Sequence, residues 1–132
     1  MSTRRFSLPA RFRSFGFALS GLGFMLRTQH NAWIHLAATV LVAAAGLALR
    51  VTASDWRWLA FAIALVWVAE AMNTAFEHLC DVVSPEFHIS VQRSKDVAAG
   101  AVLVCAIAAA VVGALTLLPY VAALSSGPPA IN

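Results

Sequence analysis

The sequence predicts an all-α membrane protein in which an N-terminal surface helix precedes three membrane-spanning helices. Of its 132 residues, 61% are hydrophobic and only 11% are charged, whereas a soluble domain carries about a quarter charged residues. The apolar residues gather in three stretches, at about 32–49, 58–80 and 97–118. Each stretch has the length with which an α-helix crosses the hydrocarbon core of a bilayer, ~17–25 residues.

The segment at about 11–29 is predicted to be an amphipathic helix on the membrane surface. One face is apolar and another carries polar and basic residues: Phe12, Phe15, Leu19, Leu22 and Leu26 against Arg13, Ser20 and Arg27. Such a helix buries its apolar face at the edge of the acyl chains and keeps its arginines among the headgroups. A short basic segment at 1–10 precedes it, and a tail of linker-like composition at 119–132 follows the last span. The domain therefore covers about residues 11–118.

Basic residues predict which ends of the spans face the cytoplasm. Five arginines precede the first span, and Arg93 and Lys95 lie in the polar loop at 85–96, between the second and third spans. The segment between the first and second spans holds two arginines, and the tail holds no charge. By the positive-inside rule, the N-terminus and the 85–96 loop face the cytoplasm, and the C-terminus faces outward.

Five polar residues form one stripe on the otherwise apolar second span. They follow one another at i, i+3, i+4, i+7 and i+11: Glu70, Asn73, Thr74, Glu77 and Asp81. At ~100° per residue they share one face of a helix. Ionisable residues at membrane depth usually face a bundle interior or a cavity, where they mark functional sites. From Glu70 to Glu77 the stripe extends ~10 Å, enough to join a membrane-buried group to a phosphate-bound metal ion.

These residue types suit phosphoryl transfer from ATP to a lipid hydroxyl. A poorly solvated carboxylate at Glu70 would act as a base toward an alcohol, and Asn73 would orient it without adding charge. Glu77, nearer the membrane edge, suits Mg²⁺ ligation. Lys95 and the neighbouring carboxylate of Asp96 would meet the phosphates of ATP at the membrane surface.

Two other functions fit the same stripe. Asp and Glu stripes also line proton and ion pathways, and buried polar residues also join helices in scaffolds that catalyse nothing. The sequence contains no Walker-type Gly-rich loop, nucleophile elbow or metalloprotease helix. Any ATP site must therefore be built from helix faces and one loop. Three helices bury too little polar surface to hold three carboxylates, so the chain is expected to form oligomers.

The chain resembles the bacterial integral-membrane diacylglycerol kinase family, which includes the undecaprenol kinases. The matching segments are EAMNTAFEHLCD at 70–81, PEFH at 85–88 and KDVAAGAVL at 95–103. The resemblance implies a homotrimer with shared active sites. It also implies transfer of the γ-phosphoryl of MgATP to diacylglycerol, giving phosphatidic acid, or to undecaprenol, giving undecaprenyl phosphate. The expected partners are ATP, a lipid alcohol and further copies of the chain, with no nucleic acid.

The resemblance also assigns roles to individual residues. Glu70 becomes the catalytic base, with Asn73 beside it, and Glu77 the metal ligand. The residues implied to contact ATP are Phe17, Gln29, Glu77, Glu86, Phe87, His88, Lys95 and Asp96. Ala98 and Ala99 leave room for the lipid substrate.

One position departs from the family pattern. Where the family usually has a second metal-binding glutamate before the first span, this chain has Gln29. An amide oxygen ligates Mg²⁺ without supplying charge, so Gln29 is expected to be a weak ligand beside Glu77.

Overall fold

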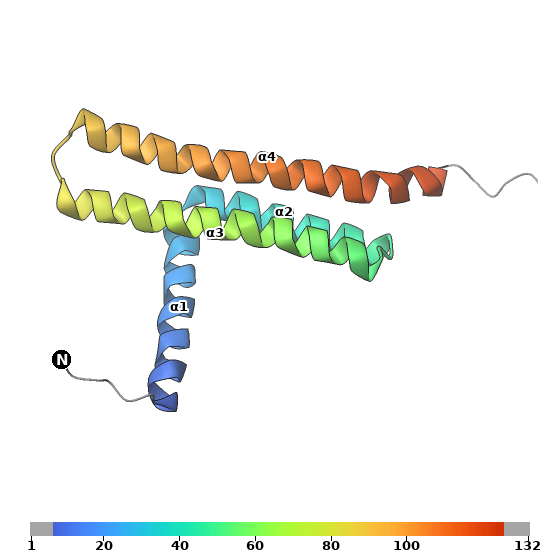
Figure 1. Ribbon diagram of the computed structural model, residues 1–132, viewed down its shortest axis with the longest axis horizontal. Coiled ribbons are helices and arrows are strands. Elements are labelled where there is room, and N and C mark those ends of the chain that lie inside the picture. Colours follow the sequence, from blue (N-terminus) through green and yellow to red (C-terminus); the bar gives the residue numbers. More distant parts are fainter. Residues whose placement is uncertain (1–6, 126–132) are drawn as a thin grey trace, which may run out of the picture.

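The computed structural model describes residues 7–125, and the four elements in that part of the chain are all α-helices (Figure 1). They are α1 (Leu8–Thr28), α2 (His30–Ala48), α3 (Ala53–Val83) and α4 (Ile89–Ser125). The all-α prediction is therefore confirmed. Most of the expected basic segment, residues 1–6, and the end of the expected tail, residues 126–132, lie outside the described residues.

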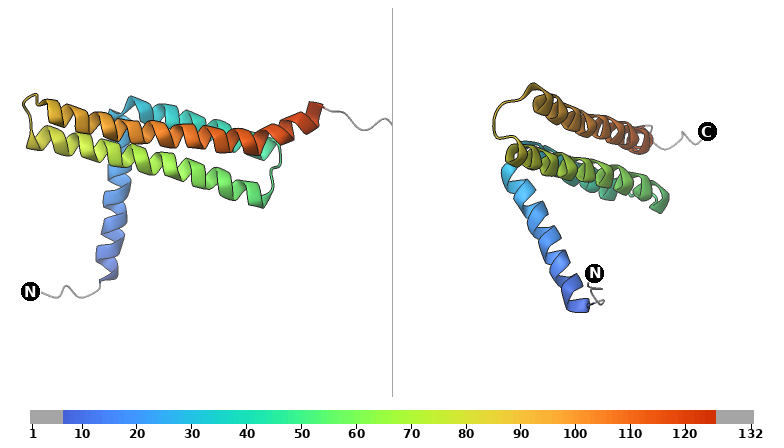
Figure 2. Two further views of the ribbon diagram at one scale, coloured as in Figure 1. Left: turned by 45° about the horizontal axis from the view of Figure 1, so that its top comes forward. Right: turned by 60° about the vertical axis from the view of Figure 1, so that its left-hand side comes forward.

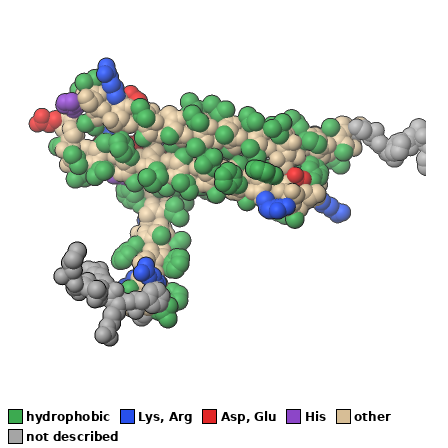
Figure 3. All heavy atoms as spheres, viewed as in Figure 1, with side chains coloured by type: hydrophobic (Ala, Val, Ile, Leu, Met, Phe, Trp, Pro, Cys, Tyr) green, Lys and Arg blue, Asp and Glu red, His purple; other side chains and the backbone are tan. Residues whose placement is uncertain are grey.

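Helices α2, α3 and α4 form an elongated bundle whose neighbours in sequence run antiparallel (Figures 1 and 2). The most extensive contact is between α3 and α4, and α2 packs mainly on α3. Charged side chains gather at the two ends of the bundle, with a hydrophobic belt between them (Figure 3). All three helices are long and apolar enough to cross a membrane. The three predicted spans therefore correspond to three helices that could cross a membrane, as expected of an integral membrane protein.

The polar loop between the second and third spans is shorter than the sequence predicts. It covers residues 84–88, so Lys95 and Asp96 lie on the first turns of α4 rather than in the loop. A side-chain hydrogen bond stabilises the exposed face of these turns, because Gln92 Nε2 donates to Asp96 Oδ1, one helical turn away, at 2.9 Å.

The last helix also continues beyond the end of the apolar run. The sequence places the start of the tail at Pro119, whereas α4 passes through Pro119 and ends at Ser125. Proline removes one helical hydrogen bond and bends a helix without necessarily ending it. The end of α4 is accordingly bent away from the bundle axis (Figure 2).

Polar contacts near both ends set the register between α3 and α4. Near one end Lys95 of α4 pairs with Asp81 of α3. Near the other end the Tyr120 hydroxyl donates to Asp55. In an antiparallel pair held at these two points, Glu77 is level with residue 99 and Glu70 with residue 106.

Helix α1 leaves the bundle sideways at Gln29 (Figure 1). The backbone of Gln29 is extended, at φ −107° and ψ 118°, so α1 and α2 are separate helices. Only the end of α1 is anchored, where Met25 is buried and the Phe24 ring lies 4.9 Å from the His78 ring of α3. The predicted helix at 11–29 is thus present.

Candidate active site

The inner part of the polar stripe of α3 faces the inside of the bundle, whereas Asp81 at its outer end is exposed. Glu70 is fully buried, and Asn73 and Thr74 are each only 5% exposed. Residues on the opposite face, such as Val68 and Met72, are exposed. An apolar helix in a membrane turns its ionisable groups away from lipid in this way. The sequence-predicted stripe is therefore one face of α3 around a buried carboxylate.

Glu77 is hydrogen-bonded to two other predicted site residues, which come from two segments of the chain. Gln29 Nε2 donates to Glu77 Oε2 at 3.2 Å, and Asn73 Nδ2 donates to Glu77 Oε1 at 3.1 Å. Gln29 reaches this position because the break between α1 and α2 lies beside the second turn from the end of α3. The expected neighbours Gln29 and Glu77 are therefore in direct contact.

His35 belongs to the same site, although the sequence analysis did not include it. Its Nε2 lies 3.7 Å from Glu70 Oε2, and both side chains are largely buried. Within the described residues, His35 Nε2, both Glu70 carboxylate oxygens and Asn73 Oδ1 are buried without a hydrogen-bond partner. Buried polar atoms are nearly always paired, so such a cluster is typical of a place where a ligand completes the bonding. A histidine inside an apolar span is the sequence signal that could have identified it.

Lys95 pairs with a different carboxylate from the expected one. Its ammonium contacts Asp81 at the end of the α3 stripe, while Asp96 accepts from Gln92. Lys95 precedes the apolar run of α4, and the hydrogen bond to Asp81 raises its pKa above the ordinary value. The ammonium therefore stays charged at neutral pH, at the same end of the bundle as Glu77.

Residues 16–117 match the family model of prokaryotic diacylglycerol kinase. The chain belongs to the prokaryotic diacylglycerol kinase family. It is a lipid kinase, as are two relatives named undecaprenol kinase and diacylglycerol kinase.

The two relatives differ in name and in length. The undecaprenol kinase of Bacillus subtilis is 33% identical over 108 residues, which cover 82% of this chain and 88% of the relative. The diacylglycerol kinase of Synechocystis sp. is 39% identical over 112 residues, which cover 84% of this chain and 64% of the relative. Both matches therefore agree with membership of the family.

Several residues predicted to contact ATP in this lipid kinase lie apart from the buried cluster. Phe17 is 75% exposed on the part of α1 that projects from the bundle. Glu86, Phe87 and His88 are exposed in the loop beyond Lys95. A single chain brings Gln29, Glu77, Asn73 and Glu70 together. It leaves the four exposed residues, Phe17 and those at 86–88, at its periphery.

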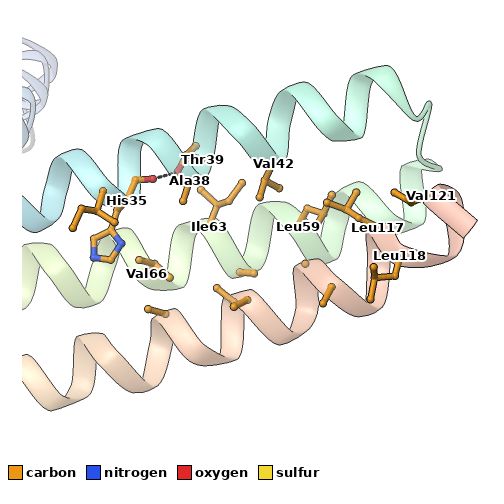
Figure 4. Close-up of a pocket in the computed structure, with 17 residues that line it drawn as sticks. His35, Ala38, Thr39, Val42, Leu59, Ile63, Val66, Leu117, Leu118 and Val121 are labelled. Atoms are coloured by element: carbon orange, nitrogen blue, oxygen red, sulfur yellow. Dashed lines mark hydrogen bonds between the residues drawn. The ribbon is translucent and has the colours of Figure 1, made fainter.

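A cavity lies further along α4 than Ala98 and Ala99, the two residues predicted to leave room for the lipid substrate. Ala98 and Ala99 are level with Glu77, whereas a cavity of about 480 Å³ begins at Ala106. It lies between α2, α3 and α4, with His35 and Thr39 near one end and apolar side chains along the rest (Figure 4). A repeated small-residue pattern on α4, which the sequence analysis did not use, lines its floor: Ala106, Ala109, Ala110, Gly113 and Ala114.

Proposed function

We propose that this lipid kinase transfers the γ-phosphoryl of ATP to the hydroxyl of a membrane lipid at the cytoplasmic face of the bacterial inner membrane. The observation that carries the proposal is the α3 stripe. It joins Glu70, whose buried oxygens have no partner, to Glu77, which lies beside the break between α1 and α2. The stripe thus connects a place for a buried hydroxyl with a place for a charged nucleotide.

The depth of each group follows from α1. With α1 on the cytoplasmic membrane surface, Gln29 and Glu77 lie at the boundary and Glu70 lies ~10 Å below it. Asp81, four residues beyond Glu77, is ~6 Å further out, and Lys95 is paired with it. A lipid hydroxyl would arrive from below and ATP from above.

Glu70 is the proposed catalytic base. Its free carboxylate oxygens accept the proton of the lipid hydroxyl, whose oxygen attacks the γ-phosphorus while the bond to the ADP oxygen breaks. Asn73, held by its bond to Glu77, offers its free Oδ1 to orient the hydroxyl. His35 Nε2 lies close enough to Glu70 to fix the position of the acceptor oxygen. Lys95 neutralises the phosphates when it exchanges Asp81 for ATP.

The donors beside Glu77 suit Mg²⁺. Among residues 7–125, no three His, Cys, Asp or Glu side chains gather in a way that would hold a metal. Mg²⁺ does not need such a cage, because it keeps several waters and binds through one or two carboxylates plus phosphate oxygens. Glu77 would hold the ion, with the amide oxygen of Gln29 turned toward it, and the bound ion would neutralise charge on the transferred phosphoryl group.

A homotrimer would complete the site. One chain leaves Phe17 and the loop at 86–88 away from Glu77, and most of its large apolar side chains are exposed. A neighbouring copy would bring these aromatic and polar groups to the nucleotide while covering part of the apolar surface.

A proton or ion pathway has less support. Such a pathway needs polar groups across the whole membrane. The cavity that begins beside Glu70 is lined by apolar side chains beyond His35 and Thr39, so the polar groups do not continue outward along it.

The proposed reaction is tested with purified protein in mixed micelles, ATP labelled at the γ-phosphate, and a panel of diacylglycerols and polyprenols. Labelled lipid that requires both Mg²⁺ and Glu70 supports the proposal. If no alcohol in the panel is labelled while the protein remains folded, the proposed reaction is wrong. A pH-dependent ion flux in liposomes would then favour the pathway.

A further inference from the structure

Three pairs of polar residues form a ladder between α3 and the first part of α2, together with the residue that precedes α2. Residue numbers rise along α2 as they fall along α3, as expected for antiparallel helices. The pairs are Gln29–Glu77, His35–Glu70 and Thr39–Trp67. The two outer pairs are hydrogen-bonded, at 3.2 Å and 3.0 Å. The middle pair, at 3.7 Å, is too far apart for a hydrogen bond. Its separation is therefore set by the bonds on either side of it.

Thr39 connects the innermost pair of the ladder to His35. It lies one helical turn beyond His35 on α2 (Figure 4), and its Oγ1 donates to the His35 carbonyl oxygen at 2.8 Å. The same Oγ1 accepts a hydrogen bond from Trp67 Nε1 of α3 at 3.0 Å. Among residues 7–125, this is the one side-chain hydrogen bond that joins α2 to α3. Apolar helix faces gain little from one another when lipid is the alternative, so the rotation of α2 on α3 depends strongly on this bond.

The separation of 3.7 Å between His35 Nε2 and Glu70 Oε2 leaves a place for one oxygen atom. Hydrogen bonds to oxygen are ~2.7–3.2 Å long, so a hydroxyl oxygen can lie within bonding distance of both atoms at once. Both atoms are buried without a hydrogen-bond partner. A small rotation of α2 would either bring His35 into a direct bond with Glu70, which occupies the proposed base, or withdraw it from the acceptor. Turnover therefore depends on holding this separation.

We infer that Trp67 and Thr39 are positioning residues, which hold His35 at the distance from Glu70 that the acceptor hydroxyl needs. The inference rests on the proposed function, because this distance affects turnover only if Glu70 is the base. It goes beyond that function by giving a role to a tryptophan whose indole N–H bonds to Thr39 rather than to a residue of the site. Trp67 lies three residues, ~4.5 Å, deeper along α3 than Glu70.

The first experiment measures kcat and the KM for ATP in mixed micelles, with the lipid alcohol of the panel that is labelled fastest. Trp67→Phe and Thr39→Val each remove one end of the bond and keep most of the side-chain volume. Each should lower kcat by about tenfold, since a displacement of ~1 Å can cost up to ~100-fold. The KM for ATP should stay within about twofold, because the nucleotide is proposed to bind at the Glu77 end.

Two further variants test whether the hydroxyl and the indole N–H are the groups that matter. Thr39→Ser keeps the hydroxyl and should keep kcat within about twofold of the original value. Trp58→Phe is the matched control, because it makes the same change at an exposed tryptophan of the same helix. It should leave kcat unchanged.

The second experiment combines substitutions to separate positioning from general stability. The double variant Trp67→Phe with Thr39→Val should be no slower than the slower single variant, because both changes remove the same bond. In a His35→Gln background, Trp67→Phe should change kcat by less than about twofold, because the residue that it positions is gone. A loosened bundle would instead multiply the two losses and lower the midpoint of thermal unfolding in detergent for the single variant.

The outcomes separate the inference from the reaction. Equal kcat values for the original protein, Trp67→Phe and Thr39→Val overturn the inference and leave the kinase intact, as do losses that multiply with His35→Gln. An inactive but folded His35→Gln would mean that His35 takes the proton itself, which also contradicts the inference. If Trp67→Phe does not fold, Thr39→Val and Thr39→Ser decide, because the inference requires the first to be slow and the second normal. Failure of the original protein to label any alcohol would reject the proposed reaction, and the inference with it.

Discussion

Gln29 and Glu77, 48 residues apart in sequence, are joined by a hydrogen bond of 3.2 Å between Nε2 and Oε2. The amide occupies the place beside the carboxylate where a second anionic metal ligand is expected in the family. The contact links the end of α1 to the stripe of α3, so a residue outside the spans takes part in the proposed nucleotide site. Because the Gln29 amide is neutral, the proposed metal site has one anionic ligand fewer than the family pattern implies.

Gln29→Glu should lower the Mg²⁺ concentration needed for half-maximal activity by about tenfold, equivalent to ~1.4 kcal/mol. The added carboxylate would stand beside Glu77 and need a cation between the two charges. Activity is titrated against free Mg²⁺ for both proteins, with Gln29→Ala as the control that removes the amide without adding charge. Coincident curves for Gln29→Glu and the original protein would mean that residue 29 does not face the metal. Complete loss of activity would mean that the pocket requires a neutral residue.

Glu70→Gln should lower kcat by on the order of 10²–10⁴, because the amide keeps the shape of the side chain but cannot take a proton. The KM for ATP should stay within about twofold, since Glu70 lies ~10 Å below Glu77. Glu77→Gln serves as the contrast, and part of its activity should return at high Mg²⁺. Near-normal turnover of Glu70→Gln in steady-state assays would place the base elsewhere.

Lys95→Ala should raise the KM for ATP by roughly tenfold to a hundredfold, because the variant loses a charge-assisted hydrogen bond to the phosphates. Asp81→Asn should change it by only a few-fold in either direction. The pair is partly exposed, with 27% of the Lys95 side chain and 61% of the Asp81 side chain accessible, and exposed ion pairs contribute little to stability. Initial rates over a range of ATP concentrations distinguish the two variants. Equal effects would indicate that Lys95 acts mainly through its bond to Asp81.

Gly46→Ala should destabilise the bundle. A Cβ at Gly46 would lie 2.8 Å from two ring atoms of Trp56, which packs across α2 from the first turn of α3. Overpacking of this kind costs about 1–3 kcal/mol, and the gain in helix propensity offsets roughly 1 kcal/mol of it. Gly113→Ala, which meets no atom within 4 Å, is the matched control and should be neutral or slightly stabilising. Thermal unfolding in detergent measures both, and an unchanged midpoint for Gly46→Ala would mean that Trp56 moves aside freely.

The sequence by itself determined the helices, the three spans and the identity of the stripe. These features depend on local patterns, because apolar length predicts a span and a spacing of three and four residues predicts a shared helix face. The expected burial of Glu70 and Asn73 followed from the high cost of exposing polar groups to lipid. Helix ends were less predictable, because polar side chains such as Gln92 and Asp96 extend α4 beyond the membrane-like part of the sequence.

Only the tertiary structure decided which residues from different helices meet. His35 faces Glu70, and Lys95 pairs with Asp81 rather than Asp96, because the rotation of α2 and the register of α3 and α4 bring them together. The cavity between α2, α3 and α4 likewise exists only where the small residues of α4 lie opposite α2 and α3. In a membrane-like setting, where lipid is as apolar as the helix faces, such relative positions depend on packing and on a few polar contacts. Hydrophobic pattern along one helix does not encode the rotation or the register of its neighbours.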